Sequence, residues 1–99
     1  MGLRTIKWRT RASRKNLELL LWYRSHMGER AAMNYFNGIM DAVETLAQMP
    51  TIGRVDTRFS KGKSIYYSFL AHPKFRIVYR FTQRTLYVVA IRATMMKGE

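Results

Sequence analysis

The sequence predicts an α+β fold in which an antiparallel helical hairpin packs on one face of a twisted antiparallel sheet. Three observations support this prediction. Apolar residues recur every three or four positions between residues 32 and 47, as on one face of a helix. Aromatic and β-branched residues recur at every second position between residues 75 and 81, as in a strand. The periodic segments follow the order strand, helix, helix, strand, strand, strand, and the 99 residues hold no repeat or linker, so we expect one domain over residues 1–99.

The first two elements are expected to be a short strand and a helix. Residues 3–8 alternate roughly between apolar and basic side chains, which predicts the strand. Thr10 or Ser13 can cap the helix, because a hydroxyl oxygen there can accept a hydrogen bond from a free N–H of the first turn. Residues 17–24 repeat at helical spacing, and Gly28 is suited to the left-handed conformation that ends a helix.

The next helix gives the clearest periodic signal in the chain. One of its faces is apolar and the opposite face is polar, and Pro50 marks its end. Two helices separated by a short break form an antiparallel hairpin. The apolar face is formed by Ala32, Tyr35, Phe36, Ile39, Met40, Val43, Leu46 and Ala47.

A three-stranded antiparallel meander is expected after the hairpin. Residues 51–63 are polar and rich in turn formers, so they are predicted to be a loop. Residues 65–69 and 75–81 alternate as strands do, and Pro73 lies in the turn between them. Residues 86–91 are nearly all apolar or β-branched, as in a central strand that is buried on both faces.

The charge of the chain points to an anionic partner. Eighteen Lys and Arg against six Asp and Glu give a formal charge of +12. Such an excess destabilises the compact state unless a polyanion or an acidic protein covers it, so nucleic acid is the first candidate partner, an acidic protein the second and an anionic membrane surface the third. Residues 54–98 hold one acid, Asp56, among ten basic residues: Arg54, Arg58, Lys61, Lys63, Lys74, Arg76, Arg80, Arg84, Arg92 and Lys97.

Several classes of site and location are excluded by composition. The chain has no cysteine and two distant histidines, so we expect no disulfide, no metal site and no cofactor. No segment approaches the ~20 apolar residues that span a bilayer, and no signal-peptide pattern follows the basic N-terminus. We therefore expect a cytoplasmic protein without a membrane partner.

Taken together, the element order and several short motifs resemble the RelE/ParE superfamily of bacterial type II toxins, with the ParE-like subgroup favoured. The resemblance covers nearly the whole chain and implies a toxin–antitoxin, or plasmid-stabilisation, module. The motifs that carry it are Trp8-Arg9-Thr10-Arg11-Ala12, Leu46-Ala47-Gln48-Met49-Pro50-Thr51-Ile52-Gly53-Arg54, Phe75-Arg76-Ile77-Val78-Tyr79-Arg80 and Leu86-Tyr87-Val88-Val89-Ala90-Ile91.

Two mechanisms are open within this superfamily. RelE-like members are endoribonucleases that cut mRNA on the ribosome, and by resemblance Arg76, Lys61 and Lys63 would then be catalytic. ParE-like members have a longer helical hairpin, are not enzymes and poison DNA gyrase. No Tyr or His follows Tyr87, so the usual proton donor or acceptor at the end of a RelE-like chain is absent from this sequence.

The long hairpin and the missing terminal residues favour a ParE-like toxin that acts on DNA gyrase and is neutralised by an acidic antitoxin. The alternatives are a RelE-like ribonuclease, a non-toxic nucleic-acid-binding module and an inactive relic that still binds antitoxin. The assembled state is expected to be a homodimer or a toxin–antitoxin hetero-oligomer. The residues expected to bind the target or the antitoxin are Arg54, Arg58, Arg76, Arg80, Arg92 and Lys97.

Overall fold

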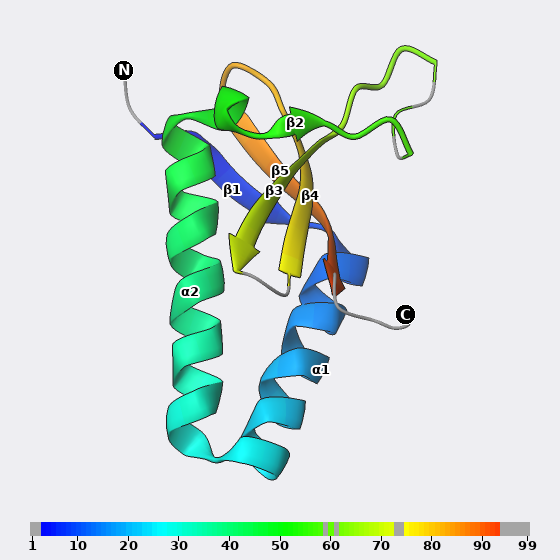
Figure 1. Ribbon diagram of the computed structural model, residues 1–99. Coiled ribbons are helices and arrows are strands. Elements are labelled where there is room, and N and C mark those ends of the chain that lie inside the picture. Colours follow the sequence, from blue (N-terminus) through cyan, green and yellow to red (C-terminus); the bar gives the residue numbers. More distant parts are fainter. Residues whose placement is uncertain (1–2, 59, 61, 73–74, 94–99) are drawn as a thin grey trace.

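The computed structural model describes residues 3–58, 60, 62–72 and 75–93. Figure 1 shows two layers, a helical hairpin and a twisted sheet, with the joined end of the hairpin extending beyond the strands. The predicted α+β architecture is thus confirmed. The elements are β1 (Thr5–Trp8), α1 (Thr10–Met27), α2 (Glu29–Gln48), the 3-10 helix η1 (Pro50–Ile52), β2 (Arg54–Val55), β3 (Tyr67–His72), β4 (Phe75–Phe81) and β5 (Thr85–Ala93).

The sheet has five strands in the order β1-β5-β4-β3-β2. The predicted antiparallel meander of β3, β4 and β5 is confirmed, whereas β1 pairs in parallel with β5 and makes the sheet mixed. Side-chain alternation does not encode the direction of a strand, which is why the sequence did not reveal this pairing. Arg4 holds the start of β1 against the end of α2, because its Nη1 donates to the carbonyl oxygen of Ala47 at 3.3 Å.

The polar stretch after Pro50 contains structure that was not predicted. Its residues form η1 and the edge strand β2, in which Arg54 pairs with Ser68. Two residues are too few to show an alternating pattern. The following strand begins at Tyr67 rather than at Ile65, which lies exposed in the loop before it.

The caps of α1 agree only in part with the prediction. Neither Thr10 nor Ser13 caps the helix, since α1 starts at Thr10 with Arg9 as its N-cap and no side-chain cap. The reason is that the backbone N–H of Arg9 still donates to Val88 on β5 at 2.9 Å, so the chain passes directly from the sheet into the helix. Gly28 ends α1 with φ +97, as predicted, a conformation that strains residues with a Cβ.

The two helices differ in how well the sequence indicated their buried faces. The apolar face of α2 packs on the sheet as predicted. On α1, by contrast, Leu17 and Leu21 are 55% and 48% exposed, and only Ala12 is fully buried. Six of the seven residues from Leu17 to Tyr23 are apolar, so the spacing alone did not define one face. The α1 residues that pack against the core are Leu19, Leu20 and Tyr23.

The apolar run of β5 is explained by a bulge rather than by burial of both faces. Val78 pairs with Ala90 and Tyr79 pairs with Val88, so Val89 is the extra residue of β5. The bulge shifts the alternation of side chains by one residue. Leu86 and Val88 before it and Ile91 after it therefore all belong to the core beneath the helices. The strand is central, as predicted, but its side away from the helices is only partly covered.

Tyr79 fastens the turn after α2 to the middle of the sheet. Its hydroxyl donates to the carbonyl oxygen of Pro50 at 2.6 Å and accepts from the N–H of Gly53 at 3.2 Å. A Cβ on Gly53 would collide with this hydroxyl and would lie 2.7 Å from the carbonyl oxygen of Ser68. Burial raises the pKa of Tyr79 to about 12. The Pro-Thr-Ile-Gly-Arg motif therefore has a structural cause, the close approach of Tyr79.

Candidate functional site

The face of the sheet that is turned away from the helices carries rows of basic side chains. Lys7, Tyr87 and Arg80 are in register on β1, β5 and β4, and Arg76, four residues before Arg80 on β4, pairs with Arg92. Side chains at paired positions point to the same face of a sheet. The pairing therefore gathers cations from three strands on one surface.

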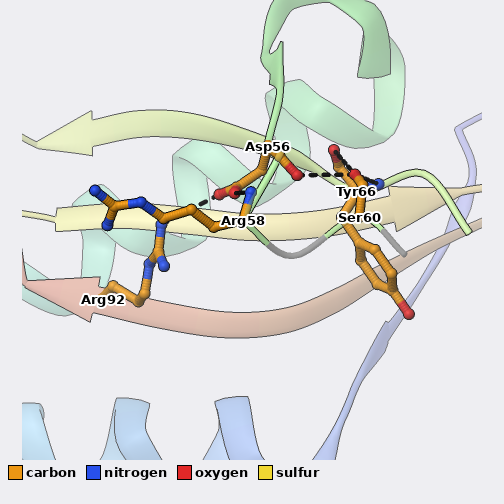
Figure 2. Close-up of polar contacts among 5 residues, drawn as sticks. All are labelled: Asp56, Arg58, Ser60, Tyr66 and Arg92. Atoms are coloured by element: carbon orange, nitrogen blue, oxygen red, sulfur yellow. Dashed lines mark hydrogen bonds and ion pairs between the residues drawn. The ribbon is translucent and has the colours of Figure 1, made fainter. Parts of the chain in front are cut away.

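Asp56 and four arginines form the first group, which we name the Asp56 cluster. The side chain of Asp56 is buried, and its Oδ2 lies 3.2 Å from Nη2 of Arg92. Its Oδ1 accepts the backbone N–H of Arg58 at 3.0 Å (Figure 2). A hollow of about 260 Å³ is lined by Arg54, Arg58, Arg76 and Arg92 together with Val55, Asp56, Thr57 and Ser68. Four of the six residues predicted to bind a partner thus meet around one buried carboxylate.

A hydrogen-bonded loop holds Asp56 in place. The N–H of Asp56 donates to the carbonyl oxygen of Tyr66 at 2.7 Å, and the hydroxyl of Ser60 donates to the carbonyl oxygen of Asp56 at 2.8 Å. The N–H of Tyr66 donates in turn to the Ser60 hydroxyl at 2.9 Å (Figure 2). The sequence showed Asp56 only as the single acid of residues 54–98, and its position at the centre of this cluster was not predicted.

The second group, the Tyr87 cluster, consists of Tyr87, Lys7, Arg9 and Arg80. The guanidinium carbons of Arg9 and Arg80 lie 5.0 and 4.8 Å from the centroid of the Tyr87 ring, within cation–π range. Lys7 is exposed and is the β1 partner of Tyr87. Of these cations, the sequence indicated only Arg80, because the others join the cluster through the parallel pairing of β1 with β5.

A third basic surface lies between α1 and β5. The pairing of β1 with β5 ends at Trp8 and Val88, so the next part of β5 borders a hollow instead of a strand. This hollow, of about 570 Å³, shares Arg92 with the Asp56 cluster. We call it the α1–β5 hollow, and it is lined by Thr10, Arg11, Arg14, Lys15, Glu18, Ala90, Ile91 and Arg92.

The residues suggested for a ribonuclease are not gathered in one place. Arg76 belongs to the Asp56 cluster, whereas Lys63 and Arg80 line a different hollow, of about 420 Å³. Lys61 and Lys97 lie outside the described residues. Within the described part of the chain, no group of three or more His, Cys, Asp or Glu residues is placed to hold a metal ion. None of the described helices is long and apolar enough to cross a membrane.

Comparisons with known proteins bear on this fold and surface. A family model described as "ParE toxin of type II toxin-antitoxin system, parDE" matches residues 6–98. A solved structure described as the chromosomal ParDE TA system from P. aeruginosa is similar with a TM-score of 0.72 and 16% identity, over 92% of this chain and 96% of that one. At this identity the structural match supports the fold. A search of curated proteins found no significant match.

Proposed function

The chain belongs to the ParE toxin family of type II toxin–antitoxin systems, and from that premise we propose that it acts on DNA gyrase and is neutralised by an acidic antitoxin. The observation that carries the choice of a protein target is the exposed apolar surface of the hairpin. Leu17 and Leu21 lie four residues apart on α1, so their exposed side chains are neighbours on the helix surface, and adjoining exposed apolar residues on a soluble domain mark a protein-binding site. Those on the hairpin are Leu17, Leu21, Trp22, Met27 and Met33.

The Asp56 cluster supports binding rather than RNA cleavage. Cleavage of a ribose phosphate needs a group that takes a proton from the 2′-hydroxyl. The carboxylate in the cluster, Asp56, is buried and already engaged by Arg92 and by the backbone of Arg58. Arginine remains protonated at any ordinary pH, so the surrounding guanidinium groups do not serve as bases. The arrangement suits the binding of carboxylates or phosphates.

The acidic antitoxin is proposed to occupy the α1–β5 hollow and to extend to the Asp56 cluster. Ala90 and Ile91, both almost fully buried, form the β5 side of the hollow, and basic side chains line its α1 wall. A disordered acidic segment that orders on binding would lie along β5 and pair its carboxylates with the basic wall. Arg92 lines both surfaces and so connects them.

Charge reversal tests the antitoxin site. We expect Arg76→Glu and Arg14→Glu to weaken binding of the cognate antitoxin at least tenfold in titration calorimetry. The matched control is Arg30→Glu, which makes the same charge change at an exposed position on the hairpin. Unchanged antitoxin affinity and unchanged toxicity in Arg76→Glu would contradict this placement.

The target is tested by inducible expression in a bacterium with pulse labelling of DNA and protein synthesis. We expect DNA synthesis to stop first, with filamentation and a DNA-damage response. The double variant Leu17→Ser and Leu21→Ser should abolish toxicity without unfolding the chain, because both side chains are about half exposed. Leu3→Ser, at an exposed apolar position outside the hairpin and the three basic surfaces, is the control. Early arrest of protein synthesis, with transcripts cut inside codons, would instead establish the RelE-like ribonuclease.

A further inference from the structure

The Tyr87 cluster is a surface that the proposed function leaves unused. It lies on the face of the sheet that is turned away from the helices. Its three cations come from different elements: Lys7 from β1, Arg9 from the residue before α1, and Arg80 from β4. Lys7 and Arg9 are exposed, and Arg80 is half-buried. The cluster is therefore accessible to a large partner.

Its arginines are ordered before any partner arrives. Arg9 and Arg80 both stack on Tyr87, at 5.0 and 4.8 Å from the ring centroid. A guanidinium stacked on a ring keeps its in-plane N–H donors for hydrogen bonds, and the bidentate geometry of these donors fits phosphate. Because the side chains are already held, less conformational entropy is lost when a ligand binds.

No carboxylate among the described residues forms an ion pair with these cations. The described acids Glu18, Glu29, Asp41 and Glu44 lie on the helices. Asp56 is engaged by Arg92 in the other cluster. Like charges held against one aromatic ring repel each other, and the chain as a whole carries a formal charge of +12. An anionic partner would relieve that repulsion.

We propose that the Tyr87 cluster binds the phosphate backbone of duplex DNA. Duplex DNA carries one charge per ~1.7 Å of its axis, so several phosphates face any cationic surface of this width. The Tyr87 ring is covered by guanidinium groups and is not free to stack on an unpaired base, which disfavours single-stranded RNA.

This proposal goes beyond the proposed function, because it concerns DNA itself and needs no gyrase. If gyrase is the target, the cluster would let the toxin touch the DNA that the enzyme holds. Contacts to phosphate alone carry no base information, so binding should be independent of sequence.

The test is fluorescence anisotropy of the purified chain with a labelled duplex of about 20 base pairs over a series of salt concentrations. Each phosphate contact contributes about 0.9 to the slope of log affinity against log salt concentration. We expect Lys7→Gln and Arg80→Gln each to lower the magnitude of that slope by about one. Arg30→Gln, which removes the same charge from the hairpin, should leave the slope unchanged.

A second variant tests the contribution of the Tyr87 ring, which holds the arginines in place, separately from that of the positive charges. Tyr87→Leu keeps every cation and removes the stacking ring, so it should lower the affinity several-fold while the slope stays the same. Thermal unfolding of each variant confirms that it is folded. Gyrase is absent from this assay, so its outcome and that of the toxicity assay are independent.

Three outcomes would overturn the proposal. The first is no binding of duplex DNA by the wild-type chain. The second is an equal slope in Arg80→Gln and Arg30→Gln. The third is tighter binding of a single-stranded RNA of equal length that is lost in Tyr87→Leu, which would make the ring a base-stacking platform.

Discussion

Replacing Tyr79 by phenylalanine should destabilise the fold through two hydrogen bonds at one hydroxyl. The ring stays, so the packing against Tyr67 at 5.7 Å between centroids is retained. The variant loses the donor to Pro50 at 2.6 Å and the acceptor for the N–H of Gly53 at 3.2 Å. Tyr79→Phe therefore removes the hydrogen bonds between β4 and the η1 turn and keeps the apolar contacts of the ring.

The expected loss of stability follows from the backbone groups that lose their hydrogen-bond partner. A buried donor or acceptor that loses its partner costs about 1–3 kcal/mol. Pro50 is buried, whereas Gly53 is only partly so and can be reached by water. We therefore expect the free energy of unfolding to fall by about 2 kcal/mol. For a domain of this size, the melting temperature would fall by roughly 8–16 °C.

Urea unfolding followed by circular dichroism measures this change. Tyr87→Phe is the matched control, because the Tyr87 hydroxyl has no hydrogen-bond partner among the described residues; it should change the free energy of unfolding by less than about 0.5 kcal/mol. Equal free energies of unfolding for Tyr79→Phe and the wild-type protein would refute the reasoning, since the two hydrogen bonds would then contribute nothing to stability.

Three more predictions concern the same turn and the neighbouring cluster. Gly53→Ala should cost about 2 kcal/mol or more, because the added Cβ collides with the Tyr79 hydroxyl; a variant as stable as the wild type in urea would contradict the fit. Burial raises the pKa of Tyr79 from 10.0 to about 12, so the stability it provides is complete below pH 10 and is lost as the pH rises towards 12; unfolding at several alkaline pH values should show this loss, and a smaller one in Tyr79→Phe. Asp56→Asn should lower the free energy of unfolding by about 1–3 kcal/mol, because it leaves Arg92 without its carboxylate partner, and it should weaken antitoxin binding; calorimetry that shows neither change would exclude an organising role for Asp56.

Local periodicity was sufficient to predict α2 and β4. Each has one face on a core, so the 3.6-residue and two-residue patterns are visible in the sequence. The pattern was misleading where the structure departs from regularity. The bulge at Val89 made β5 resemble a strand buried on both faces, and the adjacent leucines of α1 hid which side faces the core.

The candidate site was predictable in its residue types but not in its arrangement. The excess of basic residues indicated Arg54, Arg58, Arg76 and Arg92, which the fold brings to one hollow. Nothing local in the sequence shows that Asp56 joins them, because its partner Arg92 lies 36 positions away. The Tyr87 cluster was likewise hidden, since it depends on the parallel pairing of β1 with β5.

The chain belongs to the ParE toxin family, and its proposed target is DNA gyrase. The most direct measurement incubates the purified chain with purified gyrase and supercoiled plasmid, and then removes protein with detergent and protease. We predict gyrase-dependent linear DNA, which disappears when the cognate antitoxin is added and when Leu17 and Leu21 are both replaced by serine. Intact plasmid at every toxin concentration, together with cutting of mRNA on purified ribosomes, would contradict the claim.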